Sequence, residues 1–167
     1  ALLAGRGHDG GTATEEVDMD EDFRAHLEQV RAHRGELGES MRALDDALSL
    51  PLGLAVWGRR VRAALTELAS DVQDHVALTE SAGGLYPSLS ATAPRLASGI
   101  EAQLEDHRHF VVEVERLLQA RDDGISRADL AQHRDEITAL VHRLVKHRQR
   151  GSDLIYEAYE VDIGGSG

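Results

Sequence analysis

The sequence predicts an all-α fold, an antiparallel up-down-up-down four-helix bundle, on the strength of three observations. Apolar residues recur at steps of three, four and seven over four long segments, which is the spacing of one face of an α-helix. Turn signals separate these segments at Ser49-Leu50-Pro51, Ala82-Gly83-Gly84 and Asp122-Asp123-Gly124. Alternating strand patterns are nearly absent. Four amphipathic helices of roughly 25 to 34 residues with short or moderate connections favour such a bundle.

The first two segments each carry one apolar face. The apolar positions of the first are Phe23, Val30, Leu37, Met41, Leu44 and Leu48. Pro51 ends this helix, because the residue before a proline disfavours the α-helical region. The second helix runs from about 52 to 81, and its apolar positions are Trp57, Val61, Leu65, Leu68 and Val72. We expect a loop that holds Pro87 and Pro94 to follow it.

The third and fourth segments are bounded by start signals. The third begins after Pro94, because proline is favoured in the first helical turn. Its apolar positions are Leu96, Ile100, Leu104, Val111, Val114 and Leu118. The fourth opens with Ser126 and Asp129 at the spacing of a capping box. Its apolar positions are Leu130, Ile137, Leu140, Leu144 and Leu154.

Length and composition bound the domain organisation and the partners. Of the 167 residues, we assign 1–19 to a flexible acidic N-terminal arm, 20–162 to the bundle and 163–167 to a flexible tail. The formal net charge of -12 argues against nucleic acid and anionic membranes as partners, because both are polyanions. No apolar run approaches the ~20 residues that span a bilayer, so we expect a soluble, cytoplasmic protein.

The nine histidines are the least ordinary part of the composition, because six of them fall inside the apolar stripes. These six are His26, His33, His75, His107, His133 and His147. A buried stripe covers about two to three positions in seven, so roughly two or three of the eight helical histidines would fall there by chance. Burying unpaired imidazoles costs free energy, so packing alone explains six poorly.

Four of these histidines, one from each helix, are expected at a similar height along the bundle axis. At about 1.5 Å per residue, the four span roughly 10 Å of the bundle axis; they are His33, His75, His107 and His147. His26 lies near the bottom of the same layer, whereas His133 is roughly 20 Å from His147 along the fourth helix. The chain contains no cysteine, so imidazoles converging from four helices fit iron, manganese or zinc.

A di-metal centre would also need bridging carboxylates. Glu80 follows His75 by five residues and Asp153 follows His147 by six. Five residues turn an ideal helix by about 500°, which is ~140° from the starting face. A local bulge or an unwinding helix end is therefore needed to bring either acid inward, and the glycines nearby would ease it.

Several short motifs recur around the histidines in a characteristic order: Ala32-His33-Arg34-Gly35-Glu36-Leu37, Asp74-His75-Val76-Ala77-Leu78-Thr79-Glu80, Gly84-Leu85-Tyr86-Pro87-Ser88-Leu89, Leu104-Glu105-Asp106-His107 and Leu144-Val145-Lys146-His147. In their order and spacing they resemble the hemerythrin-like (HHE cation-binding) family over roughly residues 20–160. The resemblance implies an antiparallel four-helix bundle that holds a non-haem di-iron centre. Family members bind dioxygen, sense oxygen or redox state, handle nitric oxide or peroxide, or store iron.

The resemblance also implies a ligand set. The four histidines at similar height, His33, His75, His107 and His147, correspond to imidazole ligands of the family. Glu80 is similar to the bridging carboxylate of the family's second helix. That carboxylate usually follows its histidine by four residues, where this chain has Thr79. Val111 and Gly151-Ser152 stand where the third and fourth helices often carry a further histidine or an acid. These departures leave room for an altered set in which His26, Asp153, Tyr156 or Glu157 substitutes.

We therefore expect a non-haem di-iron protein that binds O2 or a related small oxidant at a histidine-rich site in the bundle core. The same centre could instead decompose peroxide or reduce nitric oxide, and the sequence does not separate an enzyme from a carrier or a sensor. The alternative hypothesis is a metal-free helical interaction module whose histidine core responds to pH. Chelator sensitivity distinguishes the two, because only a metal site predicts it.

Overall fold

The computed structural model describes residues 12–52, 55–120 and 127–164, and all regular structure in them is helical. The elements are α1 (Thr12–Leu48), α2 (Ala55–Glu80), α3 (Leu85–Thr92), the short 3-10 helix η1 (Pro94–Leu96), α4 (Ala97–Gln119) and α5 (Arg127–Gly164). The described ranges contain no strand, so the predicted all-α class is confirmed. None of these helices combines the length and the apolar character needed to cross a bilayer.

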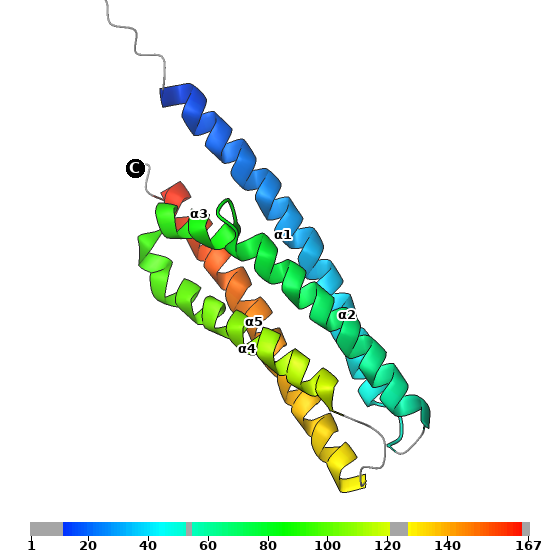
Figure 1. Cartoon of the computed structure of the whole chain (residues 1–167). Coiled ribbons are helices and arrows are strands. Elements are labelled where there is room, and N and C mark those ends of the chain that lie inside the picture. The colour runs from blue at the N-terminus through cyan, green and yellow to red at the C-terminus, as the bar shows by residue number, and fades with distance from the viewer. Residues whose placement is uncertain (1–11, 53–54, 121–126, 165–167) are drawn as a thin grey trace, which may run out of the picture.

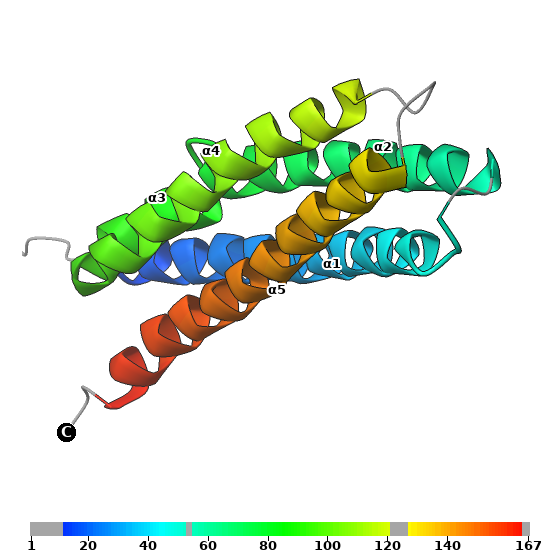
Figure 2. The same cartoon turned by 90° about the horizontal axis from the view of Figure 1, so that it is seen from below.

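The four long helices lie side by side and alternate in direction (Figure 1). α1 and α4 run one way, α2 and α5 run back, and α3 with η1 makes the connection at the upper end. Contacts join α1 to α2, α2 to α4, α4 to α5 and α5 to α1, so the helices enclose a common interior. From below, α4 and α5 are both inclined to the nearly aligned α1 and α2 (Figure 2).

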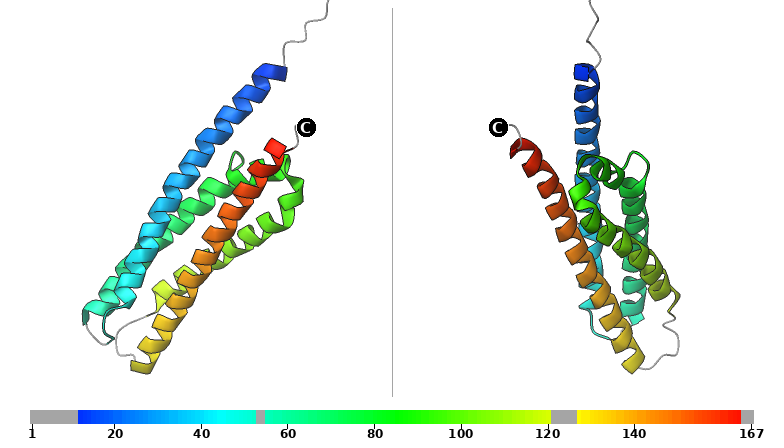
Figure 3. Two further views of the ribbon diagram at one scale, coloured as in Figure 1. Left: turned by 180° about the vertical axis from the view of Figure 1, so that it is seen from behind. Right: turned by 90° about the vertical axis from the view of Figure 1, so that its left-hand side faces the viewer.

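The first helix is longer than the sequence predicts. α1 begins at Thr12, so residues 12–19 are helical, although we expect them to belong to an irregular arm; residues 1–11 lie outside the described ranges. A helix can continue without an apolar face, because each residue added to an existing helix gains one backbone hydrogen bond. The start of α1 extends past the other helices (Figure 3). At the other end, α5 continues to Gly164, and residues 165–167 of the predicted tail are not described.

The predicted loop around Pro87 is instead a short helix. Pro87 is the third residue of α3, where its missing N–H removes no intrahelical hydrogen bond. Gly84 makes the turn before it, and a Cβ there would lie 2.7 Å from the carbonyl oxygen of Thr79. Leu85, Tyr86 and Leu89 are buried, so α3 closes the upper end of the interior.

Among the residues whose burial is described, the buried apolar side chains form two clusters along the helices. The lower cluster includes Leu37, Leu44, Leu68, Phe110, Ile137 and Leu144. The upper cluster includes Leu27, Val30, Leu89, Ile100 and Leu154. The buried polar residues lie between the two clusters along the chain: they are His75, Thr79, Gln103, Asp106, His107 and His147. This polar layer holds the candidate site.

Candidate metal centre

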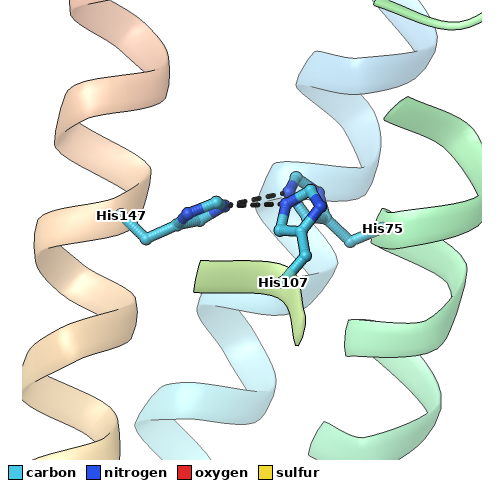
Figure 4. Close-up of side chains that lie close together, drawn as sticks. All are labelled: His75, His107 and His147. Atoms are coloured by element: carbon cyan, nitrogen blue, oxygen red, sulfur yellow. Dashed lines mark hydrogen bonds between the residues drawn. The ribbon is translucent and has the colours of Figure 1, made fainter. Parts of the chain in front are cut away.

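Three histidines from three helices meet in the polar layer: His75 of α2, His107 of α4 and His147 of α5 (Figure 4). Each lies three residues from a core residue of its own helix, namely Val72, Phe110 and Leu144. Because residues three apart share one face of a helix, the apolar stripes turn all three imidazoles inward. Their side chains are buried, and His107 is 1% exposed.

The three imidazoles direct their Nε2 atoms at a common point. Nε2 of His147 lies 3.2 Å from Nε2 of His75 and 3.2 Å from Nε2 of His107. One nitrogen from each ring falls within 4.8 Å of the others. The ring of His75 is nearly perpendicular to those of His107 and His147, so the three planes approach the point from different directions.

Two of the three imidazoles are hydrogen-bonded to carboxylates through the nitrogen that faces away from the group. Nδ1 of His107 donates to Oε1 of Glu80 at 2.6 Å, and Nδ1 of His147 donates to Oδ2 of Asp106 at 3.3 Å. A carboxylate on the far nitrogen is typical of metal-binding histidines, because it fixes the ring and raises the basicity of the other nitrogen. Nδ1 of His75 is buried and has no hydrogen-bond partner among the described residues.

Burial keeps these imidazoles neutral. Desolvation, followed by the nearby His107, lowers the pKa of His75 to about 2 and that of His147 to about 4. Desolvation also lowers the pKa of His107, against the opposing effect of Glu80. At pH 7 each ring therefore carries a single proton. In His107 and His147 it is on Nδ1, because an ionised carboxylate only accepts hydrogen bonds.

This assignment leaves two unprotonated nitrogens facing each other across a buried gap. The lone pairs on Nε2 of His107 and His147 are 3.2 Å apart and repel each other. A bound cation, or a proton on the neighbouring Nε2 of His75, relieves this repulsion. Metal–imidazole bonds of about 2.0–2.1 Å with tetrahedral angles place two nitrogens about 3.3 Å apart. The distances from Nε2 of His147 to Nε2 of His75 and to Nε2 of His107 therefore fit ligands of one metal ion.

A second metal ion finds no such ligands among the described residues. No carboxylate belongs to the three-histidine group, and the carboxylate of Glu80 lies on the outer, Nδ1 side of His107. Thr79 occupies the position where the resemblance implies an acid, and its buried hydroxyl donates to the carbonyl oxygen of His75 at 2.7 Å. The described donor set thus fits one ion and does not supply the bridges of a di-iron centre.

His33 lies beside the group without joining it. Its ring stacks on that of His75, with centroids 5.9 Å apart and planes 14° apart. Its Nε2 donates to the carbonyl oxygen of Asp71 at 3.0 Å, so that nitrogen is engaged. Of the four layer histidines, the structure therefore brings three together and places the fourth behind one of them.

The remaining sequence candidates lie away from the group. Asp153 is exposed and accepts from Nε2 of Gln149 at 2.9 Å, and the Glu157 side chain is also exposed. α5 is helical without interruption around Gly151, so it lacks the bulge that an inward-facing Asp153 would need. The spacing of both acids from His147 therefore turns their side chains outward. His26 is half-buried, and its buried Nε2 has no hydrogen-bond partner within the described part of the chain.

Sequence reasoning missed Asp106, whose side chain is 4% exposed and supports His147. A signal was present, because Gln103, Asp106 and Phe110 follow one another at steps of three and four on α4. A charged residue in register with an apolar stripe indicates a paired buried charge. The predicted separation of His133 agrees with the structure, where its ring lies 6.5 Å from that of Trp57.

The chain matches no protein-family model, no curated protein and no solved structure. The class of the protein is therefore given by the fold and the site alone: an all-α chain with a buried three-histidine group that can hold a metal ion.

Proposed function

We propose that this chain is a non-haem iron protein of the hemerythrin-like kind, with an antiparallel up-down-up-down four-helix bundle around the metal. His75, His107 and His147 would hold the ion through Nε2. Iron in this position would supply a redox-active centre for O2, peroxide or nitric oxide. The observation that carries the proposal is the convergence of three Nε2 atoms in a buried layer.

The electrostatics of the layer support a bound cation. With both Nδ1 protons directed at carboxylates, the two Nε2 lone pairs stay 3.2 Å apart without a proton between them. A metal ion converts this repulsion into two bonds. The ligand type favours iron, zinc or copper over magnesium or calcium, because imidazole is a nitrogen donor of intermediate softness.

The bundle itself would limit what reaches the ion. The apolar clusters on either side of the layer exclude water and keep the local dielectric low, which helps to set the redox potential. Small uncharged molecules such as O2 or nitric oxide suit such a site better than large or charged substrates. The alternating helix directions in Figure 1 support the bundle topology.

Metal content provides the direct test. We expect protein purified without added metal to contain iron, and chelator-treated protein to take up iron(II) with a rise in thermal stability. The described ligands lead us to expect one ion per chain, whereas the di-iron centre implied by the resemblance requires two and an oxo-bridge absorption after aerobic loading. Protein that takes up no metal, and that melts at the same temperature with and without chelator, would contradict the proposal.

One observation favours the alternative of a metal-free interaction module. The pKa values of His75 and His147 are lowered far below 6.5 by burial, so acid alone would loosen the core. A metal-free interaction module predicts the same melting temperature with and without chelator. It also predicts a partner whose binding is lost near pH 5 to 6, close to the ordinary titration range of histidine.

A further inference from the structure

We infer that Asp106 is the positioning residue of this centre. It dictates which nitrogen of His147 faces the three-histidine group, and the surface residues Arg143 and Arg150 set how much of its negative charge reaches that imidazole. The inference concerns residues outside the ligand set, and its metal-dependent half rests on the proposed function.

The contacts of Asp106 use both of its oxygens. Oδ1 accepts from Nε of Arg143 at 3.0 Å. Oδ2 accepts from Nδ1 of His147 at 3.3 Å and from Nη2 of Arg150. All three donors belong to α5, whereas Asp106 belongs to α4. One buried carboxylate thus connects two guanidinium groups at the surface to a histidine in the core.

The contact between Asp106 and His147 is more deeply buried than its counterpart at His107. The Asp106 side chain is 4% exposed, and the Glu80 side chain is 36% exposed. Water therefore screens the charge of Glu80 more than that of Asp106. Gln103 adds a second constraint on α5, because its Nε2 donates to the carbonyl oxygen of His147 at 3.2 Å.

The Asp106 carboxylate and the two guanidinium groups should have opposite electrostatic effects on a metal bound to His147. A negative Asp106 makes His147 a stronger electron donor, and therefore favours the more highly charged state of a bound metal. Arg143 and Arg150 are about half-exposed, and they withdraw part of that negative charge. Removing the carboxylate should raise the reduction potential of bound iron, and removing one guanidinium should lower it.

A metal-free experiment tests the positioning role by itself. In chelator-treated protein, 15N NMR of the imidazoles should show His147 protonated at Nδ1. Asp106→Asn should convert His147 to a mixture of tautomers, and Asp153→Asn, the same change at an exposed acid of α5, should leave it unchanged. Arg150→Gln keeps the carboxylate and should keep the Nδ1 proton, so it remains informative where Asp106→Asn folds poorly. A wild-type His147 protonated at Nε2 would overturn the inference.

A metal-loaded experiment tests the electrostatic role. Asp106→Asn should weaken iron(II) binding about 10- to 100-fold, as loss of such an outer partner usually does, and should raise the reduction potential. Arg150→Gln should lower that potential. Shifts of the same sign in both variants, or no shift in either, would overturn the electrostatic role. If the wild type binds no metal but its His147 tautomer depends on Asp106, the proposed function fails and the positioning role stands.

Discussion

Nε2 of His107 and Nε2 of His147 lie 3.2 Å apart, and each belongs to a ring whose proton is directed at a carboxylate on the opposite side. Two bare nitrogens at that separation are unfavourable in a buried layer, and a shared cation would relieve the repulsion between them. The hydrogen bonds of Glu80 and Asp106 therefore orient these two nitrogens toward the metal proposed for the site.

Replacing one ligand should abolish the stabilisation by metal. We expect His107→Ala to lose the rise in melting temperature that iron(II) gives to the wild type. A ligand present at 100 times its Kd stabilises a folded protein by about 2.7 kcal/mol, so the difference is readily measured by thermal unfolding. His142→Ala is the matched control, because His142 is exposed on α5. An equal response of both variants would place the metal elsewhere.

Metal-free protein should lose stability in acid. An unfolded histidine has a pKa of about 6.5, whereas burial lowers the pKa of His147 to about 4 and that of His75 to about 2 in the folded state. The unfolded chain then binds more protons below pH 6.5, so stability is complete above this pH and falls as the pH decreases.

Each of these histidines should remove about 1.4 kcal/mol per pH unit while it is protonated only in the unfolded chain. Urea unfolding of chelator-treated protein between pH 8 and pH 4 measures the slope. A free energy of unfolding that stays constant down to pH 4 would show that these imidazoles are not buried as neutral groups.

Two adjacent glycines should differ sharply in their tolerance of a methyl group. A Cβ at Gly84 would lie 2.7 Å from the carbonyl oxygen of Thr79 and 2.8 Å from that of Ser81, whereas a Cβ at Gly83 meets nothing within 4 Å. Because the clashing atoms are backbone, we expect Gly84→Ala to destabilise the protein by about 1–3 kcal/mol. Gly83→Ala should change the free energy of unfolding by less than ~0.5 kcal/mol. Comparable losses in both variants would contradict the structure of this turn.

The lower core should be sensitive to lost volume. Leu68 is completely buried, so Leu68→Ala should cost about 2–5 kcal/mol through lost burial and the cavity left behind. Val112→Ala provides the control, because Val112 is 67% exposed. Fluorescence of Trp57, the chain's single tryptophan, reports unfolding from the same cluster. An unchanged denaturation midpoint for Leu68→Ala would argue against the packing described.

Helical periodicity accounts for what the sequence predicts well. His75, His107 and His147 are in register with apolar stripes, so their convergence follows from the same spacing that predicts the helices. An inward-facing Glu80 requires a distortion of the helix, but α2 stays regular up to its last residue, Glu80. The acid therefore reaches the outer side of His107.

Contacts between helices account for what the sequence does not show. The register of Asp106 with the apolar stripe indicates a buried, paired charge, but its partners His147, Arg143 and Arg150 are known only from the structure. The sequence does not predict α3 for a different reason: Pro87 is typical of a loop, but it falls in the first turn of the helix, where proline is tolerated.

The division of the interior into two apolar clusters has a consequence for cooperativity. A polar layer provides less cohesion than continuous apolar packing, so the two halves of the metal-free chain are candidates for separate opening units, which native-state hydrogen exchange resolves. An ion bound to α2, α4 and α5 at that layer would couple the halves. We expect metal binding to convert a stepwise unfolding transition into a single one.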